Sequence, residues 1–237
     1  MGPQTIRYGE DPDQFGELSL PEGDPRGVVV VIHGGFWKAR YDLSLGRPLA
    51  EALATEGWAA WNLEYRRVGN GGGAPQTLDD VAAGIDLLGS VEGLDLRTVI
   101  TLGHSAGGHL ATWAAARVGA QARVTGVVSQ AGVLDLVRAH DLWLGSGAVR
   151  GLLGHPPGPA DAGYDPIQQV PLDVPVRCIH GRADDVVPLE ISERYVAAAS
   201  DAGGDAALTT LGGDHFVVID PGSEAWQLTL GLLDELA

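Results

Sequence analysis

Residues 98–108 read Thr-Val-Ile-Thr-Leu-Gly-His-Ser-Ala-Gly-Gly, and this stretch decides the fold. Its apolar run Val99–Leu102 is typical of a buried strand, and Gly108–Arg117 predicts a helix rich in alanine. Between them a serine lies at a sharp turn, with Gly103 and Gly107 two positions away on either side. A strand, a tight turn and a helix with a serine at the turn form the context in which that serine is an exposed nucleophile. The flanking glycines leave space where any larger side chain would collide with a neighbouring element.

Outward from this stretch, strand-like and helix-like patterns alternate along the whole chain. The run Gly27–His33 is continuous and β-branched, which is typical of a parallel strand covered on both faces. The other predicted strands are a two-strand entry within Thr5–Leu20, then Trp58–Leu63, Val124–Ala131, Val174–His180 and Ala206–Leu211. The other predicted helices are Leu43–Glu56, Thr77–Leu88, Leu189–Ala202 and Gly222–Leu236. This alternation predicts an α/β fold, in which a mostly parallel sheet is flanked by helices on both faces.

One stretch departs from this alternation. Residues 132–170 contain two short apolar pieces and a segment rich in proline and glycine, without a clear strand signal. About forty residues of this kind inside a compact domain predict a small helical lid or cap insertion. The length of 237 residues fits one domain, so we expect 1–237 to be a single α/β domain that carries this insertion.

Charge and composition exclude several classes of function. The net charge is −16, so the surface repels phosphate backbones and anionic lipids, and neither nucleic acid nor a membrane is an expected partner. The first residues lack the apolar core of a signal peptide, and no apolar run reaches the ~18 residues of a membrane span. The single cysteine, Cys178, cannot form an internal disulfide. Together these features favour a cytoplasmic protein, whereas the oligomeric state stays open.

Three polar residues follow predicted strands in the order serine, acid, histidine. Because the carboxyl ends of parallel strands share one edge of a sheet, Ser105, Asp184 and His215 are expected to meet there. A serine hydroxyl needs an adjacent base, usually a histidine that a carboxylate orients. We therefore predict Ser105 as nucleophile, His215 as base and Asp184 as acid. Asp185 is the competing acid, and Asp214 is a weaker one.

Acyl transfer also needs N–H donors for a developing oxyanion. The amide of Ala106, directly after the serine, is one donor by position. The loop after Gly27–His33 contains consecutive glycines that allow close approach to a substrate, so Gly35 and Phe36 are the preferred second donors and Gly34 the third. His33 is expected to fix this loop through a side-chain hydrogen bond.

Taken together, these residues resemble the α/β-hydrolases of the esterase and lipase group, which includes kynurenine-formamidase-like and prolyl-oligopeptidase-like single-domain enzymes. The resemblance spans nearly the whole chain. It rests on Tyr8-Gly9 with Asp11-Pro12, His33-Gly34-Gly35-Phe36-Trp37, Glu64-Tyr65-Arg66-Arg67, Gly103–Gly108, His180-Gly181 with Asp184 and Val187-Pro188, and Asp214-His215-Phe216. The resemblance implies the same triad and the same oxyanion loop. Phe36 stands where hormone-sensitive-lipase-type enzymes have a third glycine, which argues against bulky tertiary-alcohol esters.

The expected activity is that of a serine carboxylesterase on small to medium, largely uncharged esters. The aromatic residues Trp37, Tyr65, Trp143 and Phe216 are the candidates for substrate binding. The first alternative is an arylformamidase of the N-formylkynurenine type, which the His-Gly-Gly-Phe-Trp loop motivates. A peptidase and a non-catalytic binding protein are further alternatives. No cofactor is expected, and the spacing of His104 and His109 does not favour a metal site, because residues five apart do not share one helix face.

Overall fold

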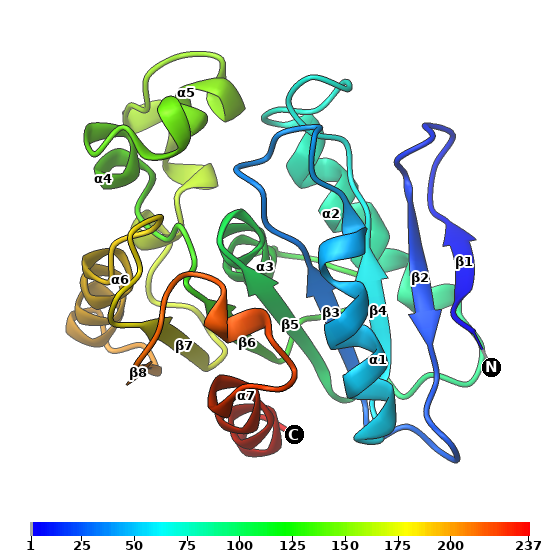
Figure 1. The fold of residues 1–237 in the computed structure, drawn as a ribbon. Helices are drawn as coiled ribbons and strands as arrows, with labels where there is room; N and C mark the ends of the chain where they lie inside the picture. The colour runs from blue at the N-terminus through cyan, green and yellow to red at the C-terminus, as the bar shows by residue number, and fades with distance from the viewer. Residues whose placement is uncertain (1) are drawn as a thin grey trace.

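Eight apolar stretches pair into one sheet in the computed structural model, which describes residues 2–237 (Figure 1). The strands are β1 (Gln4–Arg7), β2 (Phe15–Ser19), β3 (Val28–Ile32), β4 (Ala59–Leu63), β5 (Val99–His104), β6 (Gly126–Gln130), β7 (Val176–Gly181) and β8 (Ala206–Leu211). Their order in the sheet is β1-β2-β4-β3-β5-β6-β7-β8. The pairs β1–β2 and β2–β4 are antiparallel and all other pairs are parallel, which confirms the predicted mostly parallel sheet.

Helices cover both faces of the sheet and create two apolar cores (Figure 1). The helices α1 (Arg47–Thr55) and α7 (Glu224–Glu235) pack on one face, and α2 (Gln76–Asp86), α3 (Ala106–Ala115) and α6 (Glu190–Asp201) pack on the other. In β3 the alternate residues Val28 and Val30 enter one core, and Val29 and Val31 enter the other. A central strand covered on both faces has no position for a polar residue, which explains the continuous valine run.

The predicted helices begin one to four residues away from the observed ones, and two of these differences concern the site. The stretch Leu43–Glu56 divides into a 3-10 turn, Leu43–Leu45, and α1, because Gly46 lies so close to Asn62 that a Cβ there would come within 2.3 Å of its side chain. The helix α3 begins at Ala106 rather than at Gly108. Its first amide therefore follows Ser105 directly, which places the serine at the helix N-terminus.

The stretch 132–170 connects β6 to β7 and consists of short helical pieces. They are α4 (Leu136–Asp141), η3 (Leu144–Ser146), α5 (Ala148–Leu153), η4 (Pro159–Tyr164) and η5 (Pro166–Gln168). In Figure 1, α4 and α5 lie at the upper left, beyond the carboxyl ends of the parallel strands. We refer to residues 132–170 as the helical segment; that it moves as a lid remains a prediction.

Hydrogen bonds tie the helical segment to the rest of the protein at several points. Four of these bonds run from His109 Nε2 to the Tyr164 carbonyl (2.7 Å), from Trp113 Nε1 to the Gly163 carbonyl (3.0 Å), from Lys38 Nζ to the Gly145 carbonyl (2.7 Å) and from the Ala74 amide to the Leu152 carbonyl (2.7 Å). These bonds attach the segment to α3, to the loop after β3 and to the loop before α2.

The serine turn is strained and tightly packed. Ser105 has φ 55° and ψ −118°, a backbone conformation that residues other than glycine rarely adopt. A Cβ on Gly103 would lie 2.1 Å from the Gly107 carbonyl oxygen, and a Cβ on Gly107 would lie 2.0 Å from the Ile32 carbonyl oxygen. Both neighbours are backbone atoms, so α3 packs against β3 only because these positions are glycine.

We expect Gly107→Ala to destabilise the protein by about 3 kcal/mol or more, since the new methyl group has no space beside the β3 backbone. Chemical denaturation followed by circular dichroism measures this change. Gly231→Ala in α7 is the matched control, because nothing lies within 4 Å of a Cβ there. Alanine favours a helix over glycine, so the control is expected to gain up to ~1 kcal/mol. Equal stabilities for the two variants would contradict the packing argument.

Candidate active site

The three predicted chemical residues lie in loops at the same edge of the sheet. Ser105 follows β5, Asp184 follows β7 and His215 follows β8. The Nδ1 atom of His215 lies 2.6 Å from Asp184 Oδ2, and both Ser105 and His215 line a cavity of about 120 Å³. Because His215 Nδ1 is hydrogen-bonded to Asp184, Nε2 is the ring nitrogen that is available for a hydrogen bond with a hydroxyl group. The structure therefore brings the three residues together in the order that the sequence predicts.

Asp184 accepts hydrogen bonds on both carboxylate oxygens. Oδ1 accepts from the amides of Val186 (2.9 Å) and Val187 (2.8 Å), and Oδ2 lies 3.1 Å from His180 Nε2 in addition to its bond with His215. Burial alone raises the pKa of this carboxyl group, but the bonds from His180 and His215 outweigh it and hold the pKa well below its usual range. Asp184 is therefore a charged partner for the imidazole.

The two competing carboxylates have other environments. Asp185 is exposed to solvent, and Asp214 Oδ1 accepts from the amides of Phe216 (2.9 Å) and Val217 (3.2 Å). Asp214 thus stabilises the turn that carries His215. Among the three candidates, Asp184 is the one that lies within hydrogen-bond distance of the His215 ring.

The lowered pKa of Asp184 predicts a specific loss of stability in acid. A carboxyl group with a lower pKa in the folded state stabilises the fold above its unfolded pKa of about 3.9, and this contribution disappears as the pH falls toward the folded value. We expect the free energy of unfolding of the wild type to fall, relative to that of Asp184→Asn, between pH 5 and pH 3. Urea titrations of both proteins at each pH measure the difference, and a difference that is independent of pH would refute this expectation.

The loop after β3 adopts an unusual backbone beside the cavity. Gly35 and Phe36 both line the cavity, with φ 113° and φ 54°, and Trp37 continues the left-handed conformation with φ 56°. A Cβ on Gly35 would lie 2.5 Å from Tyr41, so this position requires glycine. Ala106 is the first residue of α3, where helix amides lack partners within the helix. The proposed oxyanion donors thus flank Ser105, and their role remains a prediction.

A buried ionic cluster supports this loop. His33 Nδ1 lies 2.8 Å from the Gly34 carbonyl oxygen, and Nε2 lies 3.0 Å from Glu64 Oε1, which confirms the expected side-chain bond of His33. Glu64 also accepts from the Leu43 amide (3.0 Å) and pairs with Arg67 at 3.1 Å. The carboxylate thereby connects β3, β4 and the loop between them, so the loop has a fixed position behind the cavity.

Two of the four aromatic residues predicted to bind substrate are core residues instead. Trp37 is 1% exposed and packs edge-on against His109, and Tyr65 is 0% exposed with its hydroxyl donating to the His33 carbonyl at 2.7 Å. Both therefore support the loop from below and are not available to a substrate. Trp143 is exposed on the helical segment and is not among the residues that line the cavity. Of the four, Phe216 lies at the cavity.

The cavity wall includes residues that sequence reasoning missed. Tyr41, Leu45, Val186 and Ile219 are among the residues that line it. Leu45 and Ile219 belong to short 3-10 turns, whose three residues leave no periodic pattern in a sequence. Val186 lies two residues after Asp184, and this position is the signal in the sequence that could have identified it.

His104 is a further buried residue at the cavity. Its Nε2 atom lies 3.0 Å from the His215 carbonyl oxygen, and the two rings are 4.5 Å apart. Burial, together with the neighbouring His215, lowers the pKa of His104 to about 3, so this ring is neutral at pH 7. A neutral His104 donates to the backbone of the His215 loop and does not compete with His215 for a proton.

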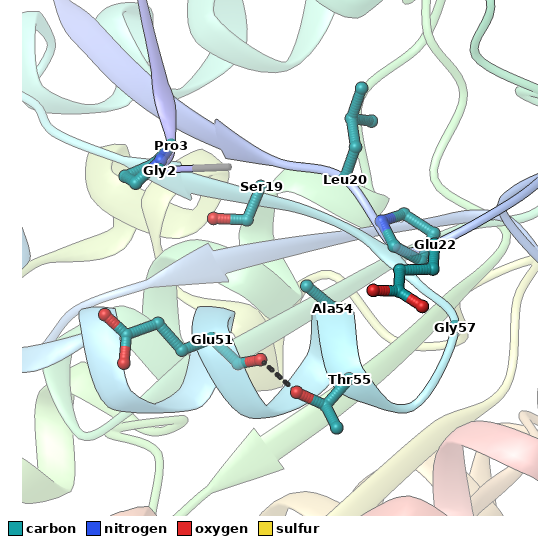
Figure 2. Close-up of a pocket in the computed structure, with 10 residues that line it drawn as sticks. Gly2, Pro3, Ser19, Leu20, Glu22, Glu51, Ala54, Thr55 and Gly57 are labelled. Carbon is teal, nitrogen blue, oxygen red and sulfur yellow. Dashed lines mark hydrogen bonds between the residues drawn. The ribbon is translucent and has the colours of Figure 1, made fainter.

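A larger hollow lies elsewhere, between the N-terminal strands and α1 (Figure 2). It has a volume of about 590 Å³ and is lined by residues that include Ser19, Leu20, Glu22 and Glu51, and the Thr55 hydroxyl beside it donates to the Glu51 carbonyl at 3.1 Å. The residues around it include neither a histidine nor a group activated by a base. The predicted triad lies outside this hollow and includes two residues, Ser105 and His215, of the smaller cavity.

Two further observations concern a metal site and a membrane-spanning helix. Across residues 2–237, no group of three His, Cys, Asp or Glu side chains is arranged to hold a metal ion. Over the same residues, each helix is too short or too polar to cross a bilayer.

Comparisons with known proteins identify the family. A family model described as BD-FAE matches residues 18–198, which is most of the chain. No match is found among the curated proteins. Among solved structures, a truncated carbohydrate esterase from gut microbiota superposes with a TM-score of 0.83 at 22% identity and covers 100% of this chain and 99% of its own.

Two further structures support the same fold. Esterase B from Lactobacillus Rhamnosis gives a TM-score of 0.84 at 22% identity, with 99% of this chain and 84% of that chain covered. A thermophilic esterase from the Planctomycetes species Thermogutta terrifontis gives 0.79 at 23% identity, with 99% and 91% covered. The family match and these superpositions agree with the topology described above, and the chain therefore belongs to the BD-FAE family and has the α/β-hydrolase fold.

Proposed function

We propose that this protein is a serine carboxylesterase in which Ser105, His215 and Asp184 form the catalytic triad. The observation that carries the proposal is the convergence of a strained serine and an aspartate-bound histidine on one apolar cavity. A histidine with its Nδ1–H bound to a carboxylate has a free Nε2 that accepts a proton. This is the arrangement that converts a serine hydroxyl into a nucleophile.

The proposed cycle has two halves. His215 Nε2 takes the proton of Ser105 as Oγ attacks the ester carbonyl, and the amides of Ala106, Gly35 and Phe36 stabilise the oxyanion. The imidazolium then gives the proton to the leaving alcohol, and the acyl group stays on Ser105. Water, activated by His215, attacks the acyl-enzyme, releases the carboxylic acid and restores the serine.

The cavity favours a short, uncharged acyl group. Its volume of about 120 Å³ corresponds to roughly four heavy atoms at about 30 Å³ each. The walls formed by Phe36, Leu45, Val186 and Ile219 are apolar, so a charged acyl group would lose its hydration without gaining a partner. Acyl chains of two to four carbons are therefore the proposed substrates.

Ester hydrolysis is favoured over the formamidase alternative. The similar structures described above are esterases by name, which supports an ester as substrate. No contact in the described residues singles out an aryl formamide, and Trp37 of the loop after β3 is buried, as is Tyr65 after β4.

The test combines a covalent probe with a set of substrates. A fluorophosphonate probe is expected to label the wild type stoichiometrically, and p-nitrophenyl acetate and butyrate are expected to be hydrolysed at least about tenfold faster than the octanoate in kcat/KM, because each excess methylene needs space that the cavity lacks. Absence of labelling in the folded protein would refute the serine mechanism. Turnover of N-formylkynurenine far above that of the short esters would refute the ester assignment.

A further inference from the structure

A second histidine lies beside the acid residue, in addition to His215. His180 is the penultimate residue of β7, and its side chain is completely buried. Its Nε2 atom lies 3.1 Å from Asp184 Oδ2, the same oxygen that His215 Nδ1 approaches at 2.6 Å. The triad mechanism does not use this histidine, although it shares the carboxylate oxygen.

The partners of His180 determine where its proton resides. Nε2 also lies 2.8 Å from the Val187 carbonyl oxygen, which can only accept a hydrogen bond, so Nε2 carries the hydrogen. On the other side Nδ1 lies 2.8 Å from Ser192 Oγ, whose hydroxyl can donate to it. Ser192 is itself completely buried on α6. The Nε2–H of the ring is thus directed at Val187 and lies beside Asp184.

These contacts surround the carboxylate. The Val187 amide donates to Asp184 Oδ1 at 2.8 Å, while the Val187 carbonyl accepts from His180 Nε2 at 2.8 Å. The same Nε2–H faces Oδ2 at the longer distance of 3.1 Å. The two carboxylate oxygens are therefore fixed in orientation, with Oδ2 directed at His215 and Oδ1 directed at the backbone.

We infer that His180, supported by Ser192, is a positioning residue that orients Asp184 Oδ2 toward His215 and shares the negative charge of that oxygen. This inference rests on the proposed triad. Without the His180 donor, Oδ2 would concentrate its charge on His215 and would be free to rotate away from it. Loss of orientation lowers kcat, and concentrated charge favours the protonated His215, which moves the acidic limb of the rate profile to higher pH.

Other titratable groups near the pair do not produce such a change. His104 on β5 packs against the His215 ring, and its pKa of about 3 keeps it neutral above pH 5. Arg182 and Asp185 of the acid loop are exposed, and the Arg182 guanidinium bonds to Thr210 on β8 at 2.6 Å. Asp214 caps its own turn.

The experiment measures kcat and KM for p-nitrophenyl acetate from pH 5 to pH 9 in the wild type, His180→Leu, His180→Gln and Ser192→Ala. We expect His180→Leu to lower kcat about tenfold and to leave KM within twofold of the wild type. We also expect it to raise the midpoint of the acidic limb of the kcat profile by about half a pH unit. His180→Gln keeps an N–H donor and is expected to restore most of both properties. Ser192→Ala is expected to move the limb in the same direction by less.

His109→Leu is the matched control, because this histidine is also completely buried but bonds to the helical segment. It is expected to lower Tm without moving the acidic limb. The inference would be overturned if the acidic limb of the kcat profile had the same midpoint pH in the wild type, His180→Leu and Ser192→Ala. It would also be overturned if His180→Gln did not restore kcat and this midpoint. Should His180→Leu fail to fold, His180→Gln and Ser192→Ala carry the test.

A spectroscopic measurement separates this inference from the proposed function. The low-field NMR signal of the proton between His215 and Asp184 is expected to shift or broaden in His180→Leu and to return in His180→Gln. This signal does not depend on turnover, so a wild type that hydrolyses no ester would refute the proposed function alone. An unchanged signal in His180→Leu would refute the positioning role alone.

Discussion

Ser105→Ala is expected to lower kcat/KM for p-nitrophenyl acetate by about 10⁵-fold or more, to the residual rate that substrate binding and the oxyanion donors support without a nucleophile. The substitution removes the attacking oxygen and retains Cβ, so the strained backbone at φ 55° receives no new atom. Tm is therefore expected to change little. Hydrolysis measured by released nitrophenolate, together with fluorophosphonate labelling, tests both statements.

The control for this variant is Ser90→Ala, which removes an exposed hydroxyl at the end of the turn after α2. It is expected to keep wild-type activity and labelling. If Ser105→Ala retained more than about one hundredth of the wild-type rate after repurification, the assignment of Ser105 as the nucleophile would be wrong.

Asp184→Asn is expected to lower kcat about 10⁴-fold, the size known for the same change in serine proteases. The Asn side-chain oxygen would stay with the amides of Val186 and Val187, which leaves its NH₂ group facing both His180 and His215. An NH₂ donor forces His215 to present an unprotonated Nδ1. The hydrogen then resides on Nε2, which can no longer accept the proton of Ser105.

Asp185→Asn provides a control of equal charge change one residue away. Because Asp185 is exposed, the kcat of Asp185→Asn is expected to stay within about twofold of the wild-type value. Stopped-assay rates at saturating p-nitrophenyl acetate compare the two variants. A large loss in Asp185→Asn with a small one in Asp184→Asn would exchange their roles.

The residues of the triad could be predicted because each lies in a loop that follows a strand. Parallel strands end at one edge, so Ser105, Asp184 and His215 had to meet once the strand order along the chain was read correctly. The choice of Asp184 over Asp185 depended on one residue of register in a turn. The backbone amides of Val186 and Val187 fix that register, and their direction is a property of the folded loop.

Side-chain direction is what the sequence could not supply. Trp37 follows Gly35 and Phe36, but its left-handed backbone turns the ring inward against His109, and no pattern in the sequence marks that turn. Tyr65 likewise stacks on His33 at 4.4 Å within the ionic cluster. The pieces of the helical segment are too short for a periodic signal, so composition alone indicated that they were not strands.

The hydrogen bonds of the helical segment limit how often this segment separates from the rest of the protein. Four of its hydrogen bonds at about 1 kcal/mol each amount to ~4 kcal/mol, and the ion pairs Arg138–Glu190 and Arg194–Asp135 add to them, so fewer than roughly one molecule in a thousand is open. A substrate that waited for this rare state would bind about a thousandfold more slowly than one that did not. Phe216 and Leu45, which are 58% and 40% exposed, already connect the cavity to solvent. Entry beside these two residues needs no opening of the helical segment, because residues 132–170 are not among those that line the cavity.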